Sequence, residues 1–215
     1  MNFQLNRLAA AARLSFALGV AGTLLSACGG DDSQPTNDLP TGITQQGVTA
    51  YPASAIGAGD TAATQDLLTA GLGRTGLGRA TAPTYADPLA PTALELRRNA
   101  THSNYRALLD PSANGGYGSL YGPNVDVAGV ATSSEGLIPG REYIASLDDG
   151  GGLKRTVIAV QVPDSFNQAA PCLVLGPSSG SRGVYGAVAT AGEWALKHGC
   201  AVALTDAGKG VASTT

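Results

Sequence analysis

PCLVLGPSSGSRGVYGAVATAGEWALKHGCAVALTDAGK, residues 171–209, decides the fold that this sequence predicts. An uninterrupted apolar run at 172–175 leads into a turn rich in Gly and Ser at 176–183. From Ala187 the apolar residues recur at three- and four-residue steps, which is typical of a helix, and a second apolar run follows at 200–204. Uninterrupted apolar strands are expected where helices cover both faces of a parallel sheet. The stretch therefore predicts a βαβ unit.

Upstream of this unit the hydrophobic pattern changes to a period of two. Segments 141–147 and 154–162 alternate in this way and are separated by DDGGG at 148–152, a strong hairpin signal. An antiparallel pair that leads into a parallel βαβ unit predicts a mixed sheet, and hence an α/β fold. The order of hairpin, strand, glycine-rich turn, helix and strand is how the amino-terminal part of an α/β-hydrolase begins. We expect helix and loop to precede it.

The chain begins with a targeting segment. Arg7 and Arg13 precede an apolar run at 14–25 that is too short to span a bilayer as a permanent helix. LSAC at 25–28 resembles a bacterial lipobox, in which cleavage leaves Cys28 as a lipidated amino terminus. The alternative is an ordinary signal peptide with Cys28 near the cleavage site. Either way the sequence predicts a signal peptide at 1–27 and an exported protein, anchored to the outer membrane, periplasmic or secreted.

Charge and composition exclude several classes of partner. Cleavage after residue 27 removes two arginines and lowers the formal net charge from −3 by two units, to −5. A mildly acidic exported domain has no electrostatic basis for binding nucleic acid, and we expect membrane contact only through a lipid anchor at Cys28. No metal is expected. Gly71, Gly73 and Gly76 have the spacing of a dinucleotide fingerprint, but a predicted helix precedes them where a strand is required, so no cofactor is expected.

The remaining chain divides into a tether and one domain. Residues 28–58 are polar and interrupted by Gly and Pro, as in a flexible tether, and 59–215 would then be a truncated α/β-hydrolase-like domain. Within it, 60–70 predicts a short helix and 71–79 a flexible loop. Residues 91–110 predict a longer helix with an apolar face, and the polar residues of that helix are expected to lie away from the apolar face. These are Arg97, Arg98 and Asn104.

Two cysteines other than Cys28 stand at the starts of the strands of the βαβ unit. Cys172 and Cys200 would come within disulfide reach if those strands are neighbours in an oxidising compartment. The alternative is a pair of small buried thiols, because Cys is among the most buried residue types. The pattern leaves both open.

The glycine- and serine-rich turn contains a possible nucleophile. GPSSG at 176–180 fits the G-x-S-x-G elbow, in which a strained strand-to-helix turn presents a serine, and Ser178 and Ser181 are the candidates. The only later histidine is His198, at the far end of the helix that the turn begins. A helix of about 12 residues is about 18 Å long, so His198 is too distant to act as their base.

A better role for the turn is to stabilise an oxyanion, because the loop after the third strand of this fold donates a backbone N–H to the reacting carbonyl. The residues that would form this loop are Ser179, Gly180, Ser181, Arg182 and Gly183. Arg182 could orient an acidic substrate group, or it could simply face solvent, and the serines could simply cap the helix. Asp206 follows the next strand at the sheet edge where ligands bind, or it forms an Asx turn.

Several blocks of sequence, taken together, resemble the bacterial 3-hydroxybutyrate oligomer hydrolase family. They are SNYRAL at 103–108, GGYG and the following residues to 124, SSGSRGVYG at 178–186, TAGEW at 190–194 and KHGCAVA at 197–203. The resemblance implies an esterase that cuts dimers and short oligomers of (R)-3-hydroxybutyrate to monomer in poly(3-hydroxybutyrate) degradation. It also implies serine acyl-enzyme chemistry and a small-molecule ester as the partner.

In that family the catalytic serine lies further along the chain, so the resemblance implies a nucleophile beyond Thr215. On this interpretation the present chain is incomplete and inactive alone. A different hypothesis is a lipoprotein module that binds hydroxybutyrate oligomers without chemistry, and a third is a truncated product with no activity. A sheet interrupted after four strands would also leave an unpaired apolar edge.

Overall fold

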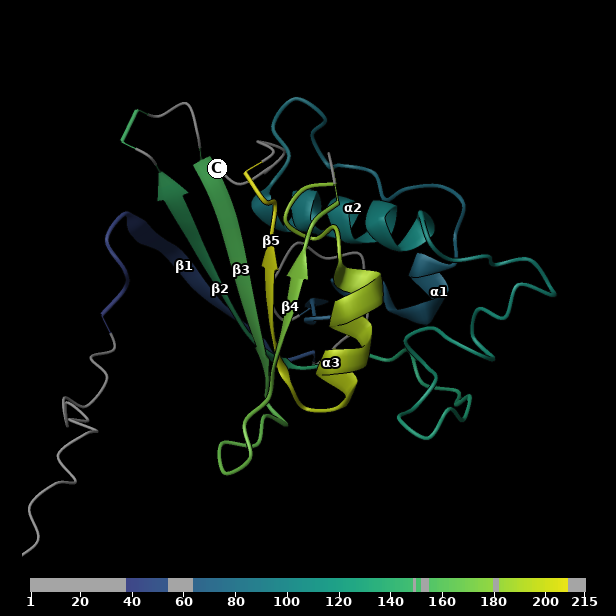
Figure 1. The fold of residues 1–215 in the computed structure, drawn as a ribbon. Helices are drawn as coiled ribbons and strands as arrows, with labels where there is room; N and C mark the ends of the chain where they lie inside the picture. The colour runs from purple at the N-terminus through teal and green to yellow at the C-terminus, as the bar shows by residue number, and fades with distance from the viewer. Residues whose placement is uncertain (1–37, 54–63, 149, 152–154, 180–181, 209–215) are drawn as a thin grey trace, which may run out of the picture. The chain divides into compact units, whose positions relative to one another are not determined.

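A five-stranded mixed sheet is the centre of the fold (Figure 1). The computed structural model describes residues 38–53, 64–148, 150–151, 155–179 and 182–208. The strand order in space is β1-β2-β3-β5-β4. The strands are β1 (Ile43–Tyr51), β2 (Gly140–Asp148), β3 (Arg155–Pro163), β4 (Leu173–Pro177) and β5 (Ala201–Thr205).

The predicted hairpin and βαβ unit are both present. β2 and β3 pair antiparallel in unbroken register, from Gly140 opposite Pro163 to Asp148 opposite Arg155. β4 and β5 pair parallel, and β5 joins the hairpin by pairing antiparallel with β3. The mixed α/β sheet expected from the hydrophobic periods is therefore confirmed, with five strands instead of four.

The helices that contact the sheet lie on one of its faces (Figure 1). They are η2 (Val188–Gly192), a single π-helical turn, and α3 (Glu193–Lys197), which continues it; α2 (Ala93–Arg106) packs on η2, and α1 (Gly73–Leu77) packs on α2. A capping box starts α2, in which Thr92 accepts a hydrogen bond from the Glu95 backbone and donates its own backbone N–H to the Glu95 carboxylate. Gly199, with φ +72°, ends the α3 segment in the left-handed conformation.

Strand β1 corrects the predicted tether at 28–58. Its residues 43–51 pair antiparallel with β2, whereas residues 28–37 and 54–58 lie outside the described part. Most of β1 is exposed, and only Tyr51 at its end is buried. An edge strand held mainly by backbone hydrogen bonds shows no hydrophobic alternation, so its sequence resembles a polar linker.

Two further expectations for the segment before α2 were wrong. Residues 64–70, the described part of the predicted helix at 60–70, form turns around the carboxylate of Asp66, which accepts hydrogen bonds from four backbone N–H groups. Local side-chain bonding of this kind competes with a helix. The predicted flexible loop at 71–79 contains the short helix α1.

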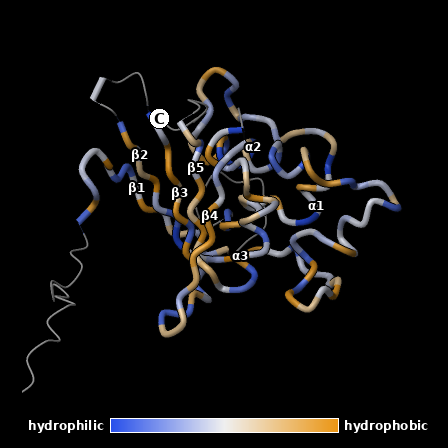
Figure 2. The backbone as a smooth tube through the Cα atoms, in the orientation of Figure 1, coloured by the Kyte–Doolittle hydropathy of each residue, from blue (hydrophilic) through white to orange (hydrophobic). Residues whose placement is uncertain are grey.

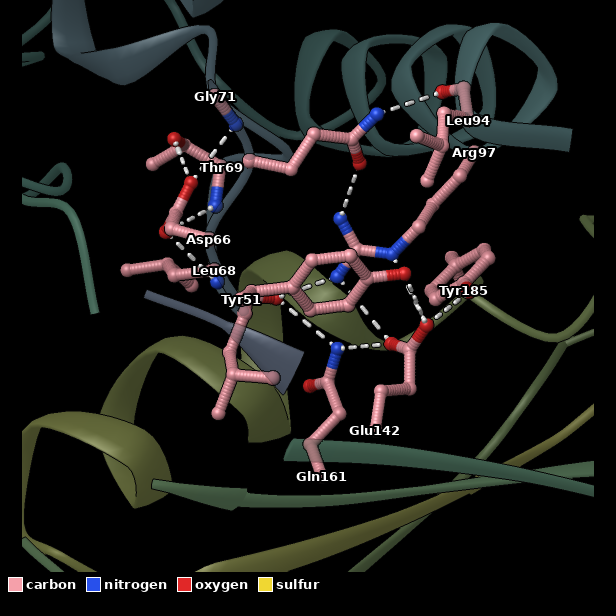
Figure 3. A network of polar contacts seen from close by, with 12 residues as sticks. Tyr51, Asp66, Leu68, Thr69, Gly71, Leu94, Arg97, Glu142, Gln161 and Tyr185 are labelled. Carbon is pink, nitrogen blue, oxygen red and sulfur yellow. Dashed lines mark hydrogen bonds and ion pairs between the residues drawn. The ribbon is translucent and has the colours of Figure 1, made fainter. Parts of the chain in front are cut away.

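The residues of α2 that the sequence places away from its apolar face are buried as well, which the hydrophobic pattern does not indicate. Arg97, Arg98 and Asn104 are all at most 6% exposed. Arg97 lies over the face of the sheet that the helices cover, which we call the inner face, and it contacts Glu142 of β2 (Figure 3). Its Nε is 3.0 Å from Glu142 Oε1 and its Nη2 is 3.2 Å from Oε2, so the ion pair is bidentate.

Further groups complete this buried pair, and we call the assembly the Arg97–Glu142 network. Gln161 Nε2 and the Tyr185 hydroxyl donate to the Glu142 carboxylate at 2.7 and 2.9 Å. The Arg97 guanidinium also lies 4.3 Å from the ring centre of Tyr51. Buried charges of this kind are tolerated only when their hydrogen-bonding capacity is met.

The electrostatics of the network favour the ionised pair. Burial opposes the charged form of Glu142, but Arg97 and the donated hydrogen bonds outweigh it and hold the pKa of that carboxyl below its usual value of 4.5. Burial also opposes the charged form of Arg97, yet Glu142 raises the pKa of the guanidinium. Burial raises the pKa of Tyr51 to about 12. The pair is therefore ionised at neutral pH.

A disulfide joins the two strands of the βαβ unit. Cys172 and Cys200 are bonded, with their Cα atoms 4.8 Å apart and a sequence separation of 28. The bond encloses the turn after β4, η2 and α3. Of the two alternatives left open by the sequence, the structure has the disulfide.

Replacing Glu142 by Gln should destabilise the fold by about 3–5 kcal/mol, because Arg97 would be left buried without a counter-charge. Urea unfolding followed by circular dichroism measures the change. Arg155→Gln is the matched control: Arg155 makes an exposed hydrogen bond to Gln46, and its loss should cost no more than about 0.5 kcal/mol. Equal unfolding midpoints for both variants would contradict a structural role for the buried pair.

The same pair predicts a dependence of stability on acid. The folded-state pKa of Glu142 is lowered, so its stabilising contribution is present above 4.5 and is lost as the pH falls below that value. Urea midpoints measured between pH 7 and pH 3 should fall more steeply in the unsubstituted protein than in Glu142→Gln. Parallel pH curves for the two proteins would show that Glu142 does not carry this linkage.

Removing the disulfide with Cys172→Ser and Cys200→Ser together should lower the free energy of unfolding by about 3–4 kcal/mol, since the enclosed loop of 28 residues gains freedom mainly in the unfolded chain. Cys28→Ser is the control and should leave the midpoint unchanged. Mass spectrometry without reductant gives an independent check. Alkylation of both thiols in the folded, unreduced protein would rule out the bond.

Candidate functional site

The predicted oxyanion turn leaves the sheet at the carboxyl ends of β4 and β5. Ser178 follows β4, and its backbone N–H donates to the Thr205 carbonyl at the end of β5 at 2.8 Å. Ser179 is exposed beside it, and its N–H has no hydrogen-bond acceptor within the described part of the chain. Gly180 and Ser181 lie outside the described residues. Ser178 therefore follows β4 at the sheet edge where ligands of open α/β sheets bind.

Ser178 does not have the geometry of a nucleophile elbow. It is 7% exposed, and its Oγ has no hydrogen-bond partner among the described residues. The side chain packs against Gly186, where an added Cβ would stand 2.3 Å from Ser178 Oγ. An elbow serine must be exposed and hydrogen-bonded to a base, so the interpretation of Ser178 as nucleophile is not supported.

Both histidines of the chain are held elsewhere. His198 is exposed at the end of α3, where its Nδ1 is 2.7 Å from the Trp194 carbonyl and its ring stacks on Trp194. His102 is buried in α2, and its Nε2 is 3.0 Å from the Arg79 carbonyl. Neither is bonded to Ser178. This agrees with the length argument that kept His198 away from the turn.

The second half of the turn is tied to the core. Asn104 of α2 donates its Nδ2 to the Arg182 carbonyl at 3.1 Å, and Gly183 has φ +70°, which glycine adopts without strain. Two residues later the Tyr185 hydroxyl reaches the Arg97–Glu142 network. Two hydrogen bonds thus hold the backbone around Arg182, while its half-buried guanidinium makes no hydrogen bond or ion pair with any described residue.

The helix begins further from the turn than the sequence indicated. It begins at Val188, and the turns at 184–187 separate it from Arg182. Its N-cap residue is Ala187, which makes no side-chain capping bond. The alternative in which the described serines of the turn cap the helix is therefore wrong, and the helix dipole does not act directly behind the turn.

Asp206 follows β5 beside Ser178 and is fully buried. Its Oδ1 accepts hydrogen bonds from the Val157 and Gly208 backbones, each at 3.0 Å, and its own N–H donates to the Val157 carbonyl at 3.1 Å. This is the Asx-type role that the sequence analysis gave as the alternative to ligand binding. The other oxygen, Oδ2, is buried and has no hydrogen-bond partner in the part of the chain that the structure describes.

A separate pocket, which sequence reasoning missed, lies among α1, α2 and the segment at 79–86. Its volume is about 800 Å³, within the usual range for small-molecule sites. The lining includes Leu72, Arg79, Tyr85 and Glu135. The Glu135 carboxylate already accepts hydrogen bonds from the backbone and hydroxyl of Thr75. No local motif marks the pocket, because its lining comes from segments far apart in sequence, from Gly71 to Glu135.

The described ranges contain neither a metal-binding cluster nor a membrane-spanning helix. No group of three or more His, Cys, Asp or Glu residues there could hold a metal ion. No helix in the same ranges is long and apolar enough to cross a membrane. The predicted signal peptide at 1–27 and the lipidation site Cys28 lie outside those ranges and stay predictions.

Comparison with known proteins gives one consistent family. The family model described as 3HB-oligomer hydrolase (3HBOH) matches residues 24–215. Proteins named D-(-)-3-hydroxybutyrate oligomer hydrolase are similar over much of the chain. The protein from Polaromonas sp. is 66% identical over 140 residues, and those from Cupriavidus necator and Burkholderia lata are 59% and 54% identical over 142 and 207 residues.

These matches cover 65%, 66% and 96% of this chain but only 20%, 20% and 29% of the respective relatives. The chain thus spans less than a third of the length of the relatives it matches. No solved structure matches. Because the family model covers most of the chain and agrees with the named relatives, the chain belongs to the 3HB-oligomer hydrolase family.

Proposed function

We propose that this chain forms part of an esterase that hydrolyses 3-hydroxybutyrate dimers and short oligomers to monomer. In this proposal it supplies the first strands of an α/β-hydrolase-like sheet and one side of the reaction site. The observation that carries the proposal is Ser178, which directly follows β4 and donates its backbone N–H to Thr205 at the carboxyl end of β5, in a chain of this family. That is the sheet edge where α/β folds place ligands.

The chemistry would be acyl transfer through a serine ester. A nucleophilic oxygen attacks the ester carbonyl, and the carbonyl oxygen takes up negative charge that backbone N–H groups stabilise. The N–H of Ser179 has no acceptor within the described part and stands at the right edge, so we assign it as one such donor. The assignment extends to the rest of the turn, Gly180, Ser181, Arg182 and Gly183.

The nucleophile and its base would come from polypeptide that the relatives possess beyond the match. The chain has two histidines, and both are bonded away from the turn. At least seven tenths of each relative lies outside the matched part. We therefore expect the 215-residue chain alone not to hydrolyse hydroxybutyrate dimer.

Arg182 is the proposed contact for the substrate carboxylate. Its backbone is fixed by Asn104, while its guanidinium has no partner among the described residues. A hydroxybutyrate oligomer ends in a carboxylate, which a guanidinium binds through paired hydrogen bonds. Export is part of the same proposal: the disulfide between Cys172 and Cys200 supports an oxidising compartment, as the leader and Cys28 predict.

The second candidate is a binding module for hydroxybutyrate oligomers without catalysis, and the pocket of about 800 Å³ favours it. Isothermal titration calorimetry of the 215-residue chain with hydroxybutyrate dimer distinguishes a binding module from a chain that binds no oligomer. Saturable binding without hydrolysis supports the module. A titration that shows no heat of binding would exclude the binding module and leave the role within the larger esterase.

The esterase proposal is tested in a hybrid in which this chain replaces the matched region of the Polaromonas hydrolase. Ser179→Pro removes one backbone N–H and should lower kcat for dimer hydrolysis by about 10²-fold. Ser179→Ala keeps the N–H and is the matched control, with kcat near that of the hybrid. Circular dichroism checks that both fold.

Ser178→Ala in the same hybrid separates the two interpretations of the turn. If the turn only donates hydrogen bonds, activity stays within a few fold of the hybrid. A loss of activity to the level of buffer would identify Ser178 as the nucleophile and overturn the oxyanion assignment. Equal activity of the Ser179→Pro and Ser179→Ala hybrids would also overturn it.

A further inference from the structure

The two faces of the sheet have different partners. Along β3, Val157, Ala159 and Gln161 are buried on the inner face, whereas Ile158, Val160 and Val162 are only half-buried on the other. Strand pairing extends this second face to β2, because Tyr143 of β2 lies opposite Val160. Figure 2 shows the hydrophobic runs of these strands. We define the outer face by Tyr143, Ile158, Val160, Val162, Leu173 and Leu175.

The outer face is most exposed at β4. Leu173 and Leu175 are 59% and 69% exposed, although their strand neighbour Val174 is partly buried against the core. Leu175 lies beside Ala203 of β5, which in turn lies beside Val160. The apolar surface is therefore continuous from β4 to β2. Contiguous exposed apolar surface of this kind marks an interaction site.

No described helix covers the outer face. The helices that touch the sheet, η2 and α3, lie on the opposite side (Figure 1). Gly176 of β4 shows which side this is, because a Cβ added there would stand 3.1 Å from Ala187 and 3.3 Å from Ala191. Leu173 and Leu175 alternate with Gly176 along the strand and point away from these helices.

The two edges of the sheet differ in how well they are suited to pair with another strand. β1 at one edge is polar, with Thr44, Gln45 and Gln46 in sequence and an irregularity in its pairing between Gln45 and Gly47. Such features discourage further pairing. β4 at the other edge is a short apolar strand that pairs with β5 alone among the described strands. Its composition is that of an interior strand of a parallel sheet.

We propose that the outer face and the free edge of β4 form one docking surface for the polypeptide that follows the matched region in the relatives. That polypeptide would add a strand beside β4 and lay the apolar side of amphipathic helices across Leu173, Leu175 and Val160. This inference rests on the proposed function in one respect: the polypeptide that docks is the one that the hydrolase relatives possess.

Two observations favour this occupant over a second copy of the chain. At least seven tenths of each relative lies outside the match, which is ample for a strand and its crossover helices. A strand added parallel to β4 requires a crossover connection that covers a face of the sheet, so one segment would satisfy both the edge and the face. A second copy packed face to face would leave the β4 edge unpaired.

Cysteine labelling tests the proposal. Leu175→Cys is made in the 215-residue chain and in the hybrid with the Polaromonas hydrolase, and the rate of maleimide addition at that residue is followed by peptide mass spectrometry. We expect at least a tenfold slower rate in the hybrid, because the added polypeptide would cover the thiol. Leu89→Cys is the matched control: Leu89 is 95% exposed in a loop, and its rate should be the same in both proteins.

Several outcomes overturn the proposal. Equal rates for Leu175→Cys in the two proteins would mean that the surface stays open. Protection in the isolated chain that grows with protein concentration would assign the face to a second copy, and protection independent of concentration would assign it to the chain's own leader. Dimer hydrolysis is measured on the same hybrid: protection without hydrolysis supports docking and counts against the esterase, and hydrolysis without protection does the reverse.

Discussion

The ion pair between Arg97 and Glu142 is the constraint on which the rest of the fold depends. Two charges removed from water are tolerated only when every element that completes their hydrogen bonds is in place. Those elements are α2, β2, β3, the end of β1 and the segment after the turn, which contribute Arg97, Glu142, Gln161, Tyr51 and Tyr185. Because they are far apart in sequence, the network selects one arrangement of the inner layer, whereas apolar packing alone accepts many.

The same network also holds one end of the candidate site. Tyr185 is anchored on Glu142, and Asn104 of the same helix as Arg97 holds the Arg182 carbonyl. The turn is therefore positioned from α2 and β2 as well as from its own strand. A substitution that weakens the buried pair should shift the turn even though it lies outside the site, since hydrogen-bonded networks transmit small displacements.

Periodicity was enough to predict the hairpin and the βαβ unit, because their strands and helix have strong patterns of period two and three to four. It failed at β1, where an exposed edge has no pattern, and on α2, where Arg97 and Asn104 are polar but buried. A buried arginine is recognisable only with its partner, and Glu142 stands 45 residues away at an ordinary strand position. The site shows the same limit: G-x-S-x-G located the turn, but the burial of Ser178 comes from Gly186, eight residues later.

The contrast between the two sheet faces follows from the kind of interaction on each. The inner face carries directional hydrogen bonds and a charge pair, which need partners at fixed positions, and this part of the chain provides them itself. The outer face is apolar around Val160 and Leu175, and hydrophobic contact is non-directional. The hydrogen bonds and the ion pair of the inner face fix the geometry of this part of the chain. The outer face can then accept an apolar layer that has a matching shape. In the proposed esterase, the remaining polypeptide is then added without rearranging the turn.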